Sequence, residues 1–190
     1  MKHLLTSLLL FFAVGICSAQ SEHMKFKGIP MEGSLNSFVD KLKSKGYTYL
    51  GQQEGIALLQ GEFAATKNCI ISVVRFSDKD QVNMVVVLLP GQKSWSSIIS
   101  DYNTFKNLLT EKYGIPNVTE SFSNQEPTSD FLKFYALLND ECHYLSEFTT
   151  ENGRIQLTMG KKDYDEASII LKYIDNANVS ETRKKIMDDL

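Results

Sequence analysis

The sequence predicts an α+β fold built from a tandem pseudo-repeat, in which a helix followed by antiparallel strands occurs twice within one domain. Residues 94–116 have the apolar spacing and the end signals of a long amphipathic helix. On each side of this helix, the apolar side chains follow the extended period that is typical of strands. No linker or low-complexity tract separates the two halves, about 34–90 and 94–175, so we expect one domain over residues 20–190.

The first 19 residues have the features of a secretory signal peptide. A short basic start precedes an uncharged apolar run, residues 4–16, which is too short to span a bilayer. Ala19 offers a small side chain at the cleavage site. Acylation of Cys17, as in a lipoprotein, is the alternative, but Ile16 stands where a small residue normally precedes a lipidated cysteine. We therefore expect cleavage near Ala19 and export to the periplasm or the extracellular medium.

The charge and the hydropathy of the chain limit the classes of partner that we expect. The chain has 190 residues, with 20 basic and 23 acidic side chains and a formal net charge of −3. A face that binds nucleic acid normally needs a basic excess, so we expect no nucleic-acid partner. No second apolar run approaches the length of a membrane span, so we expect none after the signal peptide.

The first half begins with a helix predicted over residues 34–46. Ser34 can cap its start, and Gly46 ends it. Its apolar side chains recur at three- and four-residue steps: Leu35, Phe38, Val39 and Leu42. We expect this side of the helix to face the core.

Four strands follow, over residues 48–52, 55–63, 69–76 and 82–89, and turn-forming residues separate them. Val85–Leu89 is apolar at every position. Such a strand is typical of a sheet centre that is buried on both faces. We therefore expect a helix on one side of it and more protein on the other.

The long helix is predicted over residues 94–114, with Ser94 as its cap and Gly114 and Pro116 as its stop. Its large apolar side chains fall on one arc: Trp95, Ile98, Ile99, Tyr102, Phe105, Leu109 and Tyr113. Aromatic side chains at helical spacing usually pack inward. We interpret the stripe as core and not as a ligand site.

The second half repeats the pattern in outline. A strand is predicted over 117–122, a short helix or irregular segment over 131–139, and further strands over 142–150, 154–160 and 167–175. Asn152-Gly153 predicts a tight hairpin turn, because this dipeptide accepts positive φ angles. A final helix is predicted at about 180–189, and its apolar side consists of Val179, Thr182, Ile186 and Leu190.

Cys69 and Cys142 remain after signal-peptide cleavage, and each opens the long hairpin of its half. In an oxidising compartment a single disulfide is one alternative. It requires a pseudo-twofold axis that passes nearby and brings the two Cα atoms within about 7 Å. If the axis lies elsewhere, both cysteines are small buried hydrophobes.

Several strings of the mature chain resemble those of a family of exported Bacteroides-type proteins: FKGIPMEGS, LKSKGY, GEF, KNC, WSS, LTEKYGIP, GRIQL and KKIMDDL. This resemblance covers most of the mature chain and implies export but no particular activity. In arrangement alone, the tandem is similar to the folds of the β-lactamase inhibitor protein and of outer-membrane-assembly lipoproteins. That likeness implies a fold and not a function.

No motif of catalysis, metal binding or cofactor binding is evident. Cys142 and His143 are adjacent on a predicted strand and point to opposite faces, which disfavours a thiolate–imidazole pair. Acidic side chains such as Asp163, Asp165 and Glu166 fall in a predicted turn. The glycines form neither a Walker loop nor a dinucleotide fingerprint. We therefore predict no catalytic residue, no metal ligand and no cofactor.

Two functions from different classes remain. The first is a non-catalytic exported module of the bacterial envelope that binds a protein, a peptide or an envelope component. The alternative is a hydrolase of an envelope or gut polymer that uses paired carboxylates. An accessible apolar or aromatic patch would favour binding, whereas two carboxylates facing each other in a deep cleft would favour the enzyme.

Overall fold

The computed structural model describes residues 23–75, 80–177 and 187. The predicted signal peptide and, apart from Met187, the predicted C-terminal helix lie outside these residues. Within them, no helix is long and apolar enough to cross a membrane.

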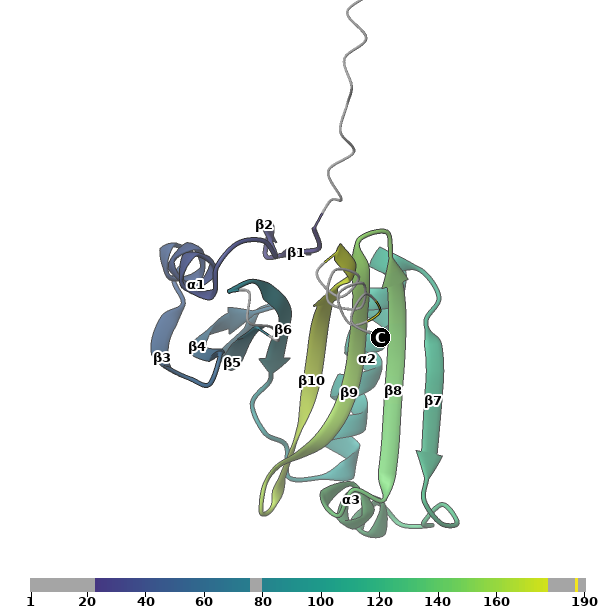
Figure 1. Ribbon diagram of the computed structural model, residues 1–190. Coiled ribbons are helices and arrows are strands. Elements are labelled where there is room, and N and C mark those ends of the chain that lie inside the picture. Colours follow the sequence, from purple (N-terminus) through teal and green to yellow (C-terminus); the bar gives the residue numbers. More distant parts are fainter. Residues whose placement is uncertain (1–22, 76–79, 178–186, 188–190) are drawn as a thin grey trace, which may run out of the picture.

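An eight-stranded antiparallel sheet forms the centre of the protein (Figure 1). Its spatial order is β3-β4-β5-β6-β10-β9-β8-β7, so each half of the chain supplies four consecutive strands, and the last strands of the two halves meet in the middle. The prediction of an α+β domain with a tandem arrangement is confirmed. The strands are β3 (Thr48–Gln53), β4 (Ile56–Phe63), β5 (Thr66–Arg75), β6 (Val82–Leu88), β7 (Asn117–Phe122), β8 (Cys142–Thr150), β9 (Gly153–Asp163) and β10 (Glu166–Asp175).

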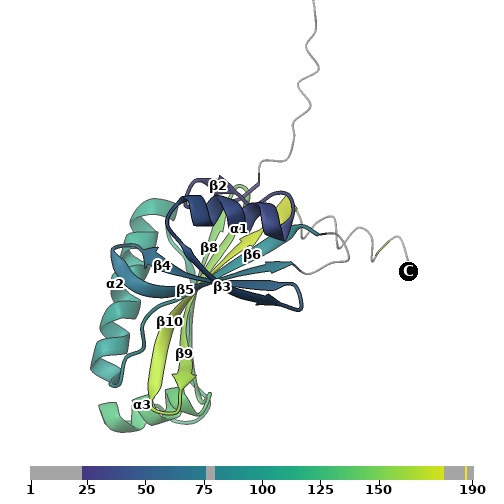
Figure 2. The same cartoon turned by 90° about the vertical axis from the view of Figure 1, so that its left-hand side faces the viewer.

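Helix α1 (Leu35–Ser44) contacts β3 and β5, whereas α2 (Trp95–Tyr113) lies along β8, β9 and β10. A short α3 (Asp130–Leu138) packs at one end of the sheet, and a small hairpin of β1 (Lys25–Phe26) and β2 (Ile29–Pro30) precedes α1 (Figures 1 and 2). Ser34 and Ser94 cap α1 and α2 as predicted, since each hydroxyl accepts from a backbone N–H three residues later at 3.2 Å. Figure 2 shows the twist of the sheet, in which β3–β6 run across the direction of β9 and β10.

The helices cover one face of the sheet, and the core lies between the two layers. Fully buried side chains follow each other across the strands in one row: Leu59, Ile71, Val87, Leu171 and Leu157. Ser146 continues this row on β8, where its hydroxyl bonds the buried Tyr102 hydroxyl of α2 at 2.7 Å. A polar pair that is fully hydrogen-bonded can be buried at little cost, so it ties α2 to the sheet in one register.

The opposite face of the sheet is also apolar over its central strands. We call it the open face, formed by Ile56, Leu58, Ile70, Val74, Met84, Val86, Leu88, Ile170 and Ile174. Met84, Val86 and Leu88 are partly exposed. Val74 is buried, but it is not part of the hydrophobic core. The expectation that more protein covers the far side of Val85–Leu89 is therefore wrong for the described residues.

The aromatic stripe of α2 is buried in part. Trp95, Ile98, Tyr102 and Leu109 are buried, while Ile99, Phe105 and Tyr113 are half-buried at the margin of the core. The stripe is core, as predicted, but its burial is uneven because the sheet twists away beneath a straight helix of 19 residues.

The β8–β9 hairpin is present, but its turn consists of Glu151 and Asn152, and neither Asn152 nor Gly153 has a positive φ angle. The expected reason for the glycine is thus wrong. Gly153 opens β9 at a point of close approach, where a Cβ atom would meet the Ile174 carbonyl and the Met24 sulfur. Its missing side chain lets the N-terminal segment pack there.

Candidate functional site

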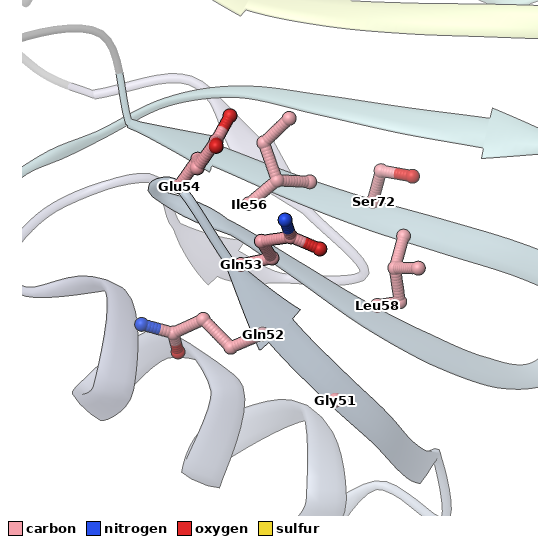
Figure 3. Close-up of a pocket in the computed structure, with 7 residues that line it drawn as sticks. All are labelled: Gly51, Gln52, Gln53, Glu54, Ile56, Leu58 and Ser72. Atoms are coloured by element: carbon pink, nitrogen blue, oxygen red, sulfur yellow. The ribbon is translucent and has the colours of Figure 1, made fainter.

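A groove on the open face lies at the β3 end of the sheet (Figure 3). It has a volume of about 760 Å³, within the range of ligand pockets. Ile56 and Leu58 of β4 project into it and are 40% and 39% exposed. Such exposure is high for large aliphatic side chains on the inner strands of a sheet, so the groove offers apolar surface to a partner. Its lining is completed by Gly51, Gln52, Gln53, Glu54 and Ser72.

The backbone of the β3–β4 hairpin shapes this groove. Gly51 follows a register shift after Tyr49, and its φ of 148° is one that other residues rarely adopt. A Cβ atom at Gly51 would meet nothing within 4 Å, so the floor beside Leu58 is open. Glu54 and Gly55 close the hairpin with φ angles of 49° and 81°, the pair of positive angles that a tight two-residue turn requires.

β3 is an edge strand of the sheet, and no described strand pairs with its outer side. Edge strands of soluble proteins usually carry charges that prevent pairing with other chains. No charged residue lies between Thr48 and Gln53, and Tyr49 and Leu50 are exposed large apolar side chains. The bulge at Tyr49 and Gly51 restricts any added strand to a short stretch. The edge and the groove thus form one continuous surface suited to an extended backbone.

A second exposed apolar surface lies on α3. Phe131 and Tyr135, one turn apart, are 76% and 57% exposed, and Leu132 beside them is also exposed. The inner side of the same helix buries Ala136 and Leu137. The exposed side of α3 could not be predicted from the sequence, because apolar residues occur on nearly all sides of this helix.

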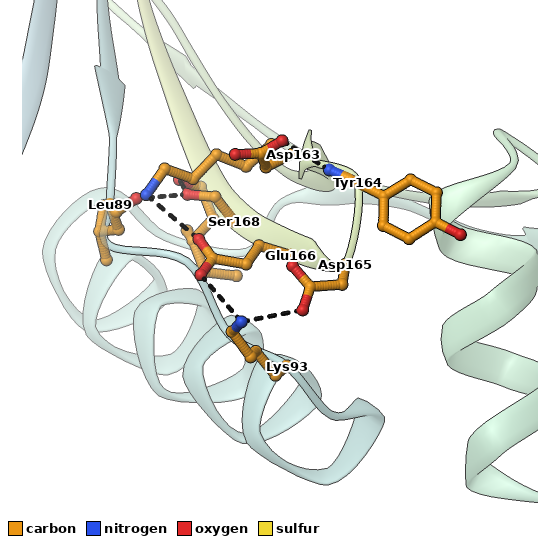
Figure 4. Close-up of polar contacts among 9 residues, drawn as sticks. Leu89, Lys93, Asp163, Tyr164, Asp165, Glu166 and Ser168 are labelled. Atoms are coloured by element: carbon orange, nitrogen blue, oxygen red, sulfur yellow. Dashed lines mark hydrogen bonds and ion pairs between the residues drawn. The ribbon is translucent and has the colours of Figure 1, made fainter.

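The predicted acidic turn joins β9 to β10 and is neutralised by lysines (Figure 4). Lys93 Nζ lies 2.8 Å from Asp165 Oδ2 and 3.7 Å from Glu166 Oε1, and Lys162 Nζ lies 3.7 Å from Glu166 Oε2. The hydrogen bond from Lys93 holds the pKa of Asp165 below its usual value. Asp163 accepts from the Tyr164 backbone N–H at 2.7 Å. Asp165 and Glu166 thus lie in solvated ion pairs with lysines, which is typical of a surface turn.

Among the described residues, no three His, Cys, Asp or Glu side chains are placed to hold a metal ion. His143 lies on β8, where its Nε2 is 3.4 Å from the Ser123 hydroxyl oxygen, and both side chains are exposed. This separation exceeds the reach of about 2.6–3.2 Å that a nucleophile and its base normally show. The pair therefore gives no support to a hydrolytic site.

Cys69 and Cys142 are both free and buried in the structure, so the disulfide alternative is wrong. Cys69 lies on β5 and Cys142 on β8, and three strands separate these two in the sheet. At about 4.8 Å per strand, the gap is near 19 Å, far beyond bonding range. The two cysteines do not occupy equivalent positions in the two halves, because β5 is the third strand of its half and β8 is the second strand of its half.

One polar contact of the N-terminal segment was not predicted from the sequence. His23 lies with Nδ1 2.9 Å from Oδ2 of Asp175, a carboxylate that is fully buried. The other oxygen of Asp175 accepts from the Met24 backbone N–H at 2.7 Å. These contacts fasten residues 23 and 24 to the end of the central strand β10. No local signal connects positions that are 152 residues apart.

None of the family models, curated proteins or solved structures compared with this chain matches it.

Proposed function

We propose that this protein is a non-catalytic binding module, exported to the bacterial envelope, which binds an extended segment of a protein or peptide at the β3 edge and the adjoining groove. The signal-peptide pattern and the resemblance to exported Bacteroides-type proteins support export. The observation that carries the binding role is the exposed pair Ile56 and Leu58 beside an edge strand without charges.

Strand addition explains why these features occur together. An added strand gains affinity from main-chain hydrogen bonds to an edge, and specificity from pockets that receive alternate side chains. Here the open floor at Gly51 leaves space for one large side chain, and Leu58 and Ile56 form its apolar wall. We expect a partner segment with an apolar side chain at that position and no acidic side chain near Glu54.

The test measures binding of three forms of the full chain: the unmodified chain, a groove variant and a control variant. Each form is tested against an envelope extract and against a displayed library of random peptides. The Leu58→Asp variant places a charge in the groove and should weaken binding of the selected peptides by roughly tenfold or more. The matched control is Leu108→Asp, an exposed leucine on α2 away from the groove, which should bind as the unmodified chain does. Circular dichroism checks that both variants fold.

Equal binding by the Leu58→Asp variant and the unmodified chain would contradict the proposal. Release of sugars or peptides from an envelope polymer, unaffected by Leu58→Asp, would favour the hydrolase instead.

A further inference from the structure

A second pocket lies on the helix-covered face of the sheet, opposite to the groove at Leu58. Its volume is about 460 Å³, within the range of ligand pockets. Tyr173 of β10 lines this pocket, and it points to the same side of the strand as the core residue Leu171, two positions earlier. The pocket and the groove therefore have separate linings.

Two tight turns and the end of α2 form the walls of the pocket. One turn consists of Lys27 and Gly28, between β1 and β2, and the other consists of Ala64 and Ala65, between β4 and β5. All four residues have positive φ angles, as two-residue turns of this kind require. Tyr113, the last residue of α2, lines the pocket as well. The walls are thus set by paired strands and by a helix end, as in a preformed site.

The apolar part of the lining is aromatic. Phe26 and Phe63 are stacked, with ring centroids 5.9 Å apart and planes that differ by 2°. Tyr173 meets both rings edge-on, at 5.2 Å from Phe26 and 6.3 Å from Phe63. Such a cluster presents ring faces and ring edges, the two surfaces against which a further aromatic ring packs. The lining therefore suits a ligand with a flat, apolar body.

The charged part of the lining is basic. Lysine is the only charged residue type among the described residues that line the pocket: Lys25, Lys27 and Lys112. Within the described part of the chain, Lys27 and Lys112 form no ion pair. Lys112 is instead placed over the Tyr113 ring, with Nζ 5.0 Å from the ring centroid. Two cations without a counterion at one pocket favour an anionic ligand.

The Tyr173 hydroxyl supplies an unused hydrogen-bond donor. Only 7% of this residue is exposed, and its hydroxyl forms no hydrogen bond with any described residue. No fully buried polar side-chain atom of the described residues lacks a partner, so the hydroxyl oxygen reaches a surface, and the pocket is a surface that Tyr173 lines. Burial, and to a smaller degree Tyr113 and Tyr47 nearby, raise the pKa of Tyr173, so it keeps its proton and can donate. Because Lys112 lies over Tyr113, a cation and this donor occur near the same ring.

We propose that this pocket binds an aromatic carboxylate. The ring system of the ligand packs against the Phe26, Phe63 and Tyr173 cluster. Its carboxylate accepts a hydrogen bond from the Tyr173 hydroxyl and pairs with Lys27 and Lys112. This inference is independent of the proposed peptide partner, because the two sites share no residue and lie on opposite faces of the sheet.

The first test is equilibrium dialysis of the full chain with 2-naphthoate and with the uncharged 2-naphthamide. The carboxylate should bind roughly tenfold more tightly, because charge-assisted hydrogen bonds are stronger than neutral ones. The double variant Lys27→Gln, Lys112→Gln should bind 2-naphthoate about tenfold more weakly than the unmodified chain. Lys41→Gln, at an exposed lysine of α1 outside the pocket, is the matched control and should have no effect.

Three results would overturn the proposal: no binding of 2-naphthoate at millimolar concentration, equal affinity for the two compounds, or unchanged affinity in the double lysine variant. Circular dichroism checks that the variants fold.

The second test separates binding from packing. Tyr173→Phe keeps the ring and removes the hydroxyl, so it should weaken 2-naphthoate binding about threefold or more. It should leave the melting temperature unchanged, because the hydroxyl has no partner among the described residues. A lower melting temperature with unchanged binding would show that the hydroxyl acts in packing and would overturn its role as donor. Leu58→Asp should bind 2-naphthoate as the unmodified chain does, so the two proposals fail separately.

Discussion

Cys142 shows how burial controls the chemistry of a single side chain. Only 4% of the residue is exposed, and removal from water raises the pKa of its thiol to about 12. A nucleophilic or metal-binding cysteine needs a thiolate, which this environment disfavours. Burial of Cys69 raises the pKa of its thiol as well. Both cysteines are therefore inert packing residues.

The raised pKa of Cys142 predicts how stability depends on pH. Up to about pH 9, the ordinary pKa of the thiol, Cys142 keeps its proton in both the folded and the unfolded state. The contribution of the buried thiol to the free energy of unfolding is then fully present. Above pH 9 the unfolded state loses the proton first, so the free energy of unfolding should fall until about pH 12. Urea unfolding of the native chain and Cys142→Ala at pH 7, 9 and 10.5 measures this, and the variant should lose less stability. Identical losses would show that the thiol is not desolvated.

At the scale of elements, α2 organises the second half through its aromatic side chains. Trp95 packs its ring 5.7 Å from Tyr144 in an edge-on contact and 5.9 Å from Phe122. Tyr102 contacts the same Tyr144 at 5.5 Å. Edge-on geometry is favoured between aromatic rings, so this cluster fixes α2 against β7 and β8.

This packing predicts unequal effects of two substitutions on α2. Trp95→Ala should lower the free energy of unfolding by roughly 3–5 kcal/mol, because a large buried ring leaves a cavity. Phe105→Ala should cost less, about 1–3 kcal/mol, because Phe105 is only half-buried. Leu108→Ala, on the exposed side, is the control and should have little effect. Chemical denaturation followed by circular dichroism measures all three, and equal losses for Trp95 and Phe105 would refute the difference in burial.

At the scale of the whole molecule, the two halves share one sheet and one core. β6 and β10 join them through five residue pairs, from Ile170 with Leu88 to Ile174 with Met84. The β1–β2 hairpin adds a second link, since Phe26 stacks on Phe63 at 5.9 Å and contacts Tyr173 edge-on at 5.2 Å. Neither half can bury its central strand without the other, so we expect them to fold together.

Cooperative unfolding is the measurable consequence. In a Cys142→Ala background, Trp95 fluorescence reports on the second half, and the reactivity of the Cys69 thiol reports on the first. The two midpoints in guanidinium chloride should coincide, as they do for a two-state domain. Exposure of Cys69 at a clearly lower concentration would mean that the halves unfold separately.

Most of the helices and strands could be predicted from the sequence, because their signals are local. Apolar spacing predicted α1 and α2 with their serine caps, and turn residues separated the strands in the correct order. The same reasoning placed Val85–Leu89 near the sheet centre, since alternation and composition report how deeply a strand is buried. It also indicated that Cys142 and His143 form no catalytic pair, because neighbours on a strand point to opposite faces.

Contacts between residues that are distant in the sequence could not be predicted in this way. The strand order separates Cys69 from Cys142 and brings β6 to β10, and neither fact has a local signal. The contact of His23 with Asp175 and the close approach at Gly153 depend on where residues 23 and 24 pack against the sheet. The groove at Leu58 likewise requires the bulge at Gly51 to lie beside β4. A periodic pattern shows that a side chain is buried, but the partner that buries it is chosen by long-range packing.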